Sequence, residues 1–180
     1  RAVDNGMTML THYYSAMSSM VKKGSWKILG ATEAGLYFDE LTVELISDGC
    51  HIPENLLKLI FKLKDRSKII GISDSMRGAG FESGESILGP KNNGTPVVIE
   101  DGVAKLADRS CFAGSIATGI RMVKTLSTLA ELDMSAVFRT VSYNPARIIK
   151  IENEIGSLEK GKYADFIIFG DDYSLDSVYI

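Results

Sequence analysis

The stretch TVELISDGCHIPENLLKLIFKLKDRSKIIGISD, residues 42–74, decides the fold. It holds an apolar run at Thr42–Ile46, an amphipathic segment at Pro53–Lys64 and a second apolar run at Lys68–Ile72. The two runs have the length of buried strands. The middle segment repeats apolar residues at helical spacing, with Pro53 in a tolerated first-turn position. A strand, a helix and a strand in this order predict a parallel α/β sheet.

The same alternation continues on both sides of this stretch. Met7–Leu10 is a short apolar run upstream, and Ser115–Leu129 and Ser135–Ile149 are predicted helices downstream. Asp133 is the predicted N-cap of the second helix. Each expected strand ends in polar residues, at the edge where parallel α/β folds place their chemistry. We therefore look for a site at the carboxyl ends of the strands.

Two stretches depart from the alternation. Residues 76–109 are rich in Gly and polar residues, and Asp101-Gly102 separates the β-like runs Thr95–Ile99 and Val103–Leu106. Asp-Gly between such runs indicates a β-hairpin, which we expect to lie over the top of the sheet. After residue 150 the character changes again, with a predicted strand at Tyr163–Phe169 and a strand-like tail. The alternating region and the tail are therefore expected to be separate units, residues 1–150 and 151–180.

Composition narrows the class of protein. Of 180 residues, 45% are hydrophobic and 24% are charged, a usual balance for a globular domain. The net charge of −3 gives no global field for nucleic acid or an anionic membrane, and no apolar run approaches ~20 residues. Cys50 and Cys111 form no CxxC pair, which favours a reducing cytoplasm over a disulfide framework. The chain begins with Arg1 and no signal peptide, so we expect a piece of a longer parent protein.

Three polar residues at predicted strand ends are candidates for chemistry. His12 could bind a metal ion through one ring nitrogen while the other is oriented by an acceptor; alternatively it is a hydrogen-bonded turn residue. His51 precedes the predicted helix and could donate to a substrate hydroxyl or phosphate, or simply start the helix. Asp74 could take a proton from a metal-bound water and return it to a leaving amine. The alternative for Asp74 is a carboxylate that caps the next turn.

A fourth candidate is the turn Phe112-Ala113-Gly114-Ser115. Gly114 allows close backbone approach, and free N–H groups at the start of the predicted helix would favour an anion or hydroxyl. The alternative is a plain N-cap at Ser115. Asn144-Pro145-Ala146 interrupts the last helix and predicts a kink or boundary.

In order, these segments resemble those of the N-acetylglucosamine-6-phosphate deacetylases of the amidohydrolase superfamily. The more specific matching segments are THYYSAM (Thr11–Met17), ISDGCH (Ile46–His51), ISDSM (Ile72–Met76) and EDGVAKLADRSCFAGS (Glu100–Ser115). The more broadly shared segments are NPAR (Asn144–Arg147) and GSLEKGKYADFIIF (Gly156–Phe169). The resemblance implies the C-terminal half of a (β/α)8 TIM barrel with a β-hairpin insertion over residues 1–150. It also implies strands of a small β-sandwich over residues 151–180.

The resemblance further implies roles for particular residues. His12 would be a ligand of a catalytic divalent metal ion, usually zinc, whose other ligands, a Glu and a second His, lie upstream of this chain. The His that polarises the acetyl carbonyl also lies upstream. Asp74 would be the general base and then the general acid. The implied substrate-binding positions are the sugar-contacting loop Asp48, Gly49, Cys50 and His51, the phosphate-holding pair Ser15 and Ala16, the turn Phe112, Ala113 and Gly114, and Lys23.

The chain departs from this family in the phosphate region. The family commonly has Asn at the position of Ser15, and shortly afterwards an Arg that reaches the phosphate in the neighbouring subunit of a dimer. The nearest basic residues here are Lys22 and Lys23. Lysine supplies a point charge without the bidentate fork of arginine, so we expect a weaker or different phosphate grip.

The resemblance implies a homodimeric parent enzyme that hydrolyses N-acetylglucosamine 6-phosphate to glucosamine 6-phosphate and acetate. One alternative is another amidohydrolase that acts on a different amide or acetylated sugar. A second alternative is a non-catalytic half-barrel, because one ligand His cannot hold a catalytic zinc that needs three protein ligands. A half-barrel also exposes two sheet edges, which favours dimerisation or aggregation. We expect the isolated chain to be inactive.

Overall fold

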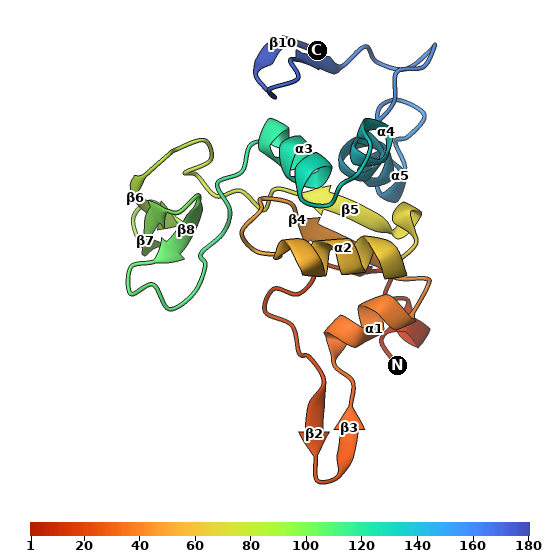
Figure 1. Cartoon of the computed structure of the whole chain (residues 1–180), viewed down its shortest axis with the longest axis vertical. Coiled ribbons are helices and arrows are strands. Elements are labelled where there is room, and N and C mark those ends of the chain that lie inside the picture. Colours follow the sequence, from red (N-terminus) through yellow and green to blue (C-terminus); the bar gives the residue numbers. More distant parts are fainter.

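A three-stranded parallel sheet forms the centre of the computed structural model, which describes all 180 residues (Figure 1). Its strands are β1 (Met9–Leu10), β4 (Thr42–Ile46) and β5 (Ile69–Ile72), adjacent in that order. The connections carry helices α1 (Ala31–Tyr37) and α2 (Glu54–Leu63). The predicted α/β alternation is therefore confirmed here. The bounds of β4 are those predicted, and α2 lies within its predicted range.

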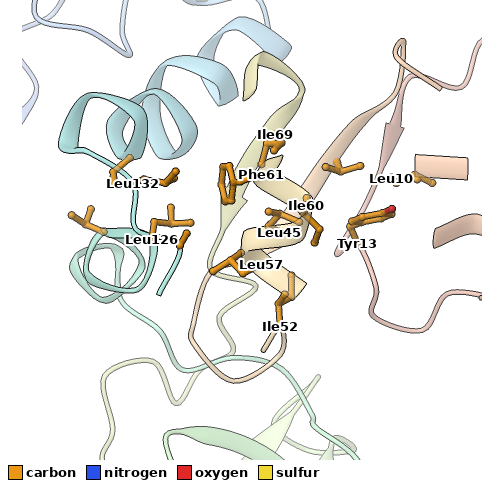
Figure 2. Close-up of a cluster of buried hydrophobic side chains, with 14 of the residues drawn as sticks. Leu10, Tyr13, Leu45, Ile52, Leu57, Ile60, Phe61, Ile69, Leu126 and Leu132 are labelled. Carbon is orange, nitrogen blue, oxygen red and sulfur yellow. The ribbon is translucent and has the colours of Figure 1, made fainter. Parts of the chain in front are cut away.

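The main core lies between this sheet and its helices. A cluster of 15 buried side chains joins the strands to α2 and to the downstream helices (Figure 2). Leu57, Ile60 and Phe61 form the buried stripe of α2, at the helical spacing visible in the sequence. Figure 2 shows them beside Leu45 of β4 and Ile69 of β5. Burying each such side chain contributes about 1.5–3 kcal/mol, so this stripe fixes α2 on the sheet.

The parallel sheet continues beyond β5 in an irregular way. Ser75 forms a parallel bridge with Ser115, and the Ser115 backbone N–H donates to the Asp74 carbonyl at 3.1 Å. The predicted helix start at Ser115 is therefore wrong, because Ser115 pairs with the end of the sheet. Helix α3 (Gly119–Thr128) begins later, and the Thr118 hydroxyl caps it by accepting from the Arg121 N–H at 3.4 Å.

An antiparallel sheet occupies the stretch between β5 and α3. Strands β7 (Thr95–Glu100) and β8 (Val103–Leu106) pair around Asp101 and Gly102, which both have positive φ, 52° and 75°. Strand β6 (Gly84–Leu88), absent from the sequence prediction, adds a third strand to β7. Figure 1 shows this sheet standing beside the parallel sheet. Its small separate core consists of Val97, Ile99, Ala104, Ala113 and Ile116.

The predicted helix over Ser135–Ile149 is present in three parts. Helix α4 (Met134–Phe138) leads through a π-helical turn at Arg139–Tyr143 into α5 (Asn144–Ile148). The predicted cap is confirmed, because an oxygen of Asp133 accepts from the Ala136 N–H at 2.9 Å. The buried Asn144 amide donates to the Arg66 and Ile69 carbonyls, both at 2.8 Å, which ties α5 to the start of β5.

Two short antiparallel ribbons complete the molecule. Strands β2 (Val21–Lys23) and β3 (Trp26–Ile28) follow β1, and β9 (Phe166–Phe169) and β10 (Leu175–Tyr179) form the tail. Strand β9 is shorter than the predicted strand at Tyr163–Phe169. The ribbons lie at opposite ends of the long axis (Figure 1). Short 3₁₀ turns occupy Val3–Asn5 and Arg66–Lys68. None of the helices has the length and apolar character that a membrane crossing requires.

Candidate active site at the strand ends

His12 lies just beyond β1 in a tight turn. Its ring Nδ1 is 3.1 Å from the Ser15 carbonyl, and its backbone N–H donates to Glu44 Oε2 at 3.4 Å. His12, Tyr14 and Ala16 all have positive φ, at 37°, 73° and 52°. Non-glycine residues seldom adopt this conformation, and such residues cluster at functional sites. The turn therefore holds the His12 ring in one orientation at the carboxyl edge of the sheet.

The loop after β4 holds a buried acid–histidine pair. Asp48 Oδ2 lies 2.7 Å from His51 Nδ1, and Asp48 Oδ1 accepts the backbone N–H groups of Cys50 and His51 at 2.9 and 3.0 Å. The Asp48 side chain is 0% exposed, and that of His51 is 8% exposed. Gly49 permits the turn with a φ of 81°. The carboxylate therefore fixes the histidine ring and directs Nε2, which has no partner in the chain, away from itself.

The charge of Asp48 is stabilised within this loop. Burial by itself raises the pKa of the carboxyl, but the hydrogen bonds from the His51 ring and from the His51 and Cys50 backbones outweigh it. The pKa of Asp48 is therefore below its usual value. The sequence predicted that Asp48 contacts a sugar. Its side chain is fully buried, so it holds His51 and presents no surface to a ligand.

Asp74 stands at the end of β5 in a different environment. The residue has a φ of 48°, its side chain is exposed, and its carboxylate makes no hydrogen bond or ion pair within the chain. Its backbone carbonyl accepts from Ser115 N–H at 3.1 Å. Gly114, with a φ of 98°, lies against this carbonyl and against Met76. The carboxylate is therefore open to solvent at the edge where His12 and His51 also lie.

The predicted turn at Phe112–Gly114 lies beside the His51 loop. The Phe112 and His51 rings meet edge to face, with centroids 5.0 Å apart. Phe112 is 44% exposed, whereas Ala113 is buried and donates its N–H to the Ala104 carbonyl at 2.8 Å. The turn is not at a helix start, so the predicted free N–H groups of a helix terminus are absent there. What it offers instead is an exposed aromatic ring next to His51.

The predicted phosphate residues are divided between two places. Ser15 and Ala16 belong to the His12 turn, where the Ser15 N–H donates to the His12 carbonyl at 2.8 Å. Lys23 lies in β2, opposite Trp26, on the exposed ribbon that extends away from the sheet (Figure 1). The structure thus brings His12, Ser15 and Ala16 together and sets Lys23 apart from them.

One of the predicted metal ligands has the geometry that the role needs. If His12 Nδ1–H donates to the Ser15 carbonyl, the lone pair of Nε2 remains for a metal ion, an arrangement usual in metal sites. No three His, Cys, Asp or Glu side chains of this chain converge as a metal-binding group. His12 therefore fits as one ligand, and the chain does not by itself supply the three that a catalytic zinc normally has.

The sequence analysis did not identify two polar residues that contact the candidate site, Glu44 and Arg121. Glu44, in the middle of β4, accepts the His12 N–H at 3.4 Å. Arg121 donates to the Asp48 carbonyl through Nε and Nη2 at 3.0 and 2.7 Å. A signal existed for Arg121, because a cation in the first turn of a helix opposes the helix dipole. The wrong helix start at Ser115 placed Arg121 in the second turn and hid that signal.

Comparisons with known proteins identify the family of the chain and support its fold. The profile of the amidohydrolase family matches residues 2–180, so the chain belongs to that family. It is 27% identical over 179 residues to the N-acetylglucosamine-6-phosphate deacetylase of Vibrio furnissii, covering 99% of this chain and 42% of that protein. It is 32% identical over 174 residues to the Bacillus subtilis (strain 168) protein of the same name, covering 95% and 41%.

A solved structure gives the same result for the fold. A mutant N-acetyl-D-glucosamine-6-phosphate deacetylase from Mycobacterium smegmatis, in complex with N-acetyl-D-glucosamine-6-phosphate, superposes with a TM-score of 0.86 at 26% identity. The match covers 99% of this chain and 45% of that one. The chain therefore spans less than half the length of the relatives that it matches.

Proposed function

We propose that the parent protein hydrolyses the acetamide of N-acetylglucosamine 6-phosphate to glucosamine 6-phosphate and acetate. The observation that carries this proposal is the arrangement of the strand ends. His12, His51 and Asp74 follow β1, β4 and β5, which are neighbours in one parallel sheet. With a strand spacing of about 4.8 Å, His12 and Asp74 leave the sheet about 10 Å apart, with His51 on the strand between them. Similarity to proteins named as deacetylases of this sugar phosphate supports the substrate.

Each residue has a separate task in the proposed reaction. Asp74 accepts a proton from the attacking water and then donates it to the departing amine, which an exposed, unpaired carboxylate can do. His51 Nε2 makes a hydrogen bond with the sugar while Asp48 holds the ring. His12 Nε2 is one ligand of a divalent metal ion, which we take to be zinc. When bound, that ion supplies Lewis-acid chemistry.

The same proposal extends to the architecture of the parent protein. Residues 1–150 would be part of a (β/α)8 barrel in which β6–β8 is an insertion, and residues 151–180 would belong to a small β-sandwich. The sequential order β1-β4-β5 and the parallel bridge of Ser75 with Ser115 support the barrel assignment. The ribbon β2–β3, with Trp26 80% exposed, supports a homodimer in which Lys23 reaches the partner's phosphate site. The free thiols of Cys50 and Cys111 support a cytoplasmic location.

Acetate release by the full-length parent protein tests the function. We expect turnover of N-acetylglucosamine 6-phosphate with zinc present, loss of turnover after chelation, and much slower turnover of unphosphorylated N-acetylglucosamine. N-acetylgalactosamine 6-phosphate tests the sugar itself. Equal turnover with and without the phosphate would contradict the proposed substrate and favour a different amide or acetylated sugar. The isolated 180-residue chain is expected to be inactive, because it supplies only His12 as a metal ligand.

A further inference from the structure

Arg121 connects three segments that are far apart in the sequence. Its guanidinium extends from the first turn of α3 to the loop after β4, where Nε and Nη2 donate to the Asp48 carbonyl at 3.0 and 2.7 Å. The two residues are 73 positions apart. Arg121 is half-buried and forms no ion pair with a carboxylate of the chain. Its charge is therefore directed at a backbone carbonyl, which makes both hydrogen bonds charge-assisted.

The same guanidinium also faces the turn between β7 and β8. A Cβ placed on Gly102 would lie 3.1 Å from Arg121 Nη2, so the guanidinium lies tightly against this glycine. Cys50 Sγ lies 3.5 Å from Arg121 Nη2 and 3.8 and 3.7 Å from the Asp101 and Gly102 carbonyls. The β4 loop, the β7–β8 turn and α3 thus meet at Arg121.

These contacts lead directly to His51. Arg121 fixes the Asp48 backbone, the Asp48 carboxylate fixes His51 Nδ1 at 2.7 Å, and Phe112 packs against the histidine ring. Phe112 itself follows β8 and pairs with Lys105 of that strand, so the antiparallel sheet supports the ring from the other side. A shift of the β4 loop would therefore move Nε2 of His51.

We propose that Arg121 is a positioning residue that sets the place of His51 Nε2 by holding the Asp48 backbone beside the β7–β8 turn. This inference rests on the proposed function, in which His51 contacts the sugar. The planar fork is essential to it, because two donors on one carbonyl fix both its position and its direction. A lysine at this position keeps the charge and supplies a single point donor.

Steady-state kinetics of the full-length parent protein test the role in binding. Arg121→Gln is expected to raise KM for N-acetylglucosamine 6-phosphate on the order of 10–100-fold, with kcat changed much less, because binding geometry is lost while Asp74 stays in place. Arg121→Lys is expected to recover part of the loss. The matched control is Lys124→Gln, which removes an exposed cation from the same helix and should leave KM unchanged. Equal effects of Arg121→Gln and Lys124→Gln would overturn the proposal.

A double-mutant cycle separates positioning of His51 from general damage. If Arg121 acts through His51, then Arg121→Gln adds no further rise in KM to a His51→Gln protein. Fully multiplicative effects of the two substitutions would overturn the proposal. Should Arg121→Gln fail to fold, the same cycle is run with Arg121→Lys, which conserves the charge.

Hydrogen–deuterium exchange tests the same contact without enzyme activity. The backbone N–H groups of Cys50 and His51 donate to the buried Asp48 carboxylate. We expect the segment Ser47–Ile52 to exchange at least about tenfold faster in Arg121→Gln than in the parent or Lys124→Gln protein. Unchanged exchange would overturn the proposal. If the parent protein does not turn over the sugar phosphate at all, the proposed function fails, while this measurement still decides whether Arg121 holds the loop.

Discussion

The loops that follow the neighbouring strands β4 and β5 each contain an aspartate, and the surroundings of the two carboxylates are opposite. Beyond β4, Asp48 and His51 are buried and locked together, and every polar atom of the carboxylate has a partner. Beyond β5, Asp74 is exposed, and its carboxylate has no partner within the chain. Both strands end at the same edge of one sheet, and both loops contain a residue with positive φ.

This difference matches the separate tasks that we propose for the two loops. A group that fixes the position of a ligand benefits from being locked, because the entropy of ordering is lost at folding rather than at binding. A group that accepts and returns a proton must keep both protonation states accessible, which a fully paired buried carboxylate does not. The comparison predicts that substitutions beyond β4 change stability, and that substitutions beyond β5 change turnover.

The largest expected effect is the loss of turnover when Asp74, beyond β5, is substituted. Asp74→Asn in the parent protein should lower kcat by about 10²–10⁴-fold, because the amide cannot accept the proton of the attacking water. The free energy of unfolding should change by less than about 0.5 kcal/mol, since the side chain is exposed and unpartnered. Glu82→Gln, an exposed carboxylate on the same connection, is the control. Turnover above a tenth of the parent value would remove Asp74 from its proposed role.

Substitution of Asp48, beyond β4, should instead lower the free energy of unfolding. Asp48→Ala leaves the half-buried N–H groups of Cys50 and His51 and the buried His51 ring without their acceptor, at a cost of about 1–3 kcal/mol in the free energy of unfolding. Urea unfolding of the parent protein at pH 7 measures this difference, with Asp48→Asn as the milder variant. An Asp48→Ala protein as stable as the parent would show that the carboxylate does not secure the loop.

The pH dependence of stability provides an independent check on Asp48. Because its pKa is lowered on folding, the carboxylate contributes stability above its unfolded pKa, about 4, and this contribution is lost as the pH falls through the folded value. The stability difference between the parent and Asp48→Asn proteins should therefore shrink as the pH is lowered from about 5 to below the folded pKa. The midpoints of urea unfolding of both proteins are measured across that interval. A stability difference that does not depend on pH would refute the lowered pKa of Asp48.

The turn after β1 is a third case, because packing of the neighbouring side chain holds it in place. Tyr13, next to His12, is fully buried, and its ring lies directly against Gly35 of α1. A Cβ on Gly35 would also lie 2.8 Å from Leu10 Cδ1. Gly35→Ala should therefore lower the free energy of unfolding by about 1–3 kcal/mol through overpacking.

The control for this substitution lies on another helix. Gly119 of α3 has open space where its Cβ would lie, so Gly119→Ala should leave stability unchanged or raise it by up to about 1 kcal/mol. Thermal unfolding of both variants makes the comparison. Equal destabilisation by the two substitutions would show that the contact with Tyr13 is not the cause.

The smallest expected effect is the change in KM when Lys23, in the ribbon β2–β3, is substituted. Lys23→Gln should raise KM for the phosphorylated substrate by about fivefold or less, because an exposed lysine contributes no more than about 1 kcal/mol to such a contact. The KM for unphosphorylated N-acetylglucosamine should not change. Lys27→Gln, on the partner strand β3, is the control. Equal shifts for both substrates would separate Lys23 from the phosphate.

The regular elements could be predicted from the sequence because their signals are local. The apolar run of β4 and the helical spacing of α2 each lie within a dozen residues, and the Asp133 cap is adjacent to its helix. The start of α3 could not be placed, since the bridge of Ser115 to Ser75 joins residues that are distant in sequence. Strand β6 depends in the same way on pairing with β7.

In the candidate site too, features that depend on local sequence could be predicted, and features that depend on packing could not. His12, His51 and Asp74 can be proposed from the sequence because each follows an apolar strand. That Asp48 is buried and that Arg121 reaches it could not be found, because these facts depend on how α3 packs against the β4 loop. The spacing of Asp48 and His51 around a glycine turn is consistent with their pairing, but the same spacing is equally consistent with two side chains that face solvent.

Two groups of antiparallel strands that follow strands of the parallel sheet have a consequence for how such a protein can diversify. The ribbon β2–β3 is inserted after β1, and the sheet β6–β8 is inserted after β5, both at the carboxyl ends of strands. Neither insertion interrupts the register of the parallel sheet. Chain length can therefore be added or removed at the edge where we propose that the substrate binds, while the pairing of the parallel sheet beneath stays constant. Substrate choice and catalytic framework can then change at independent rates.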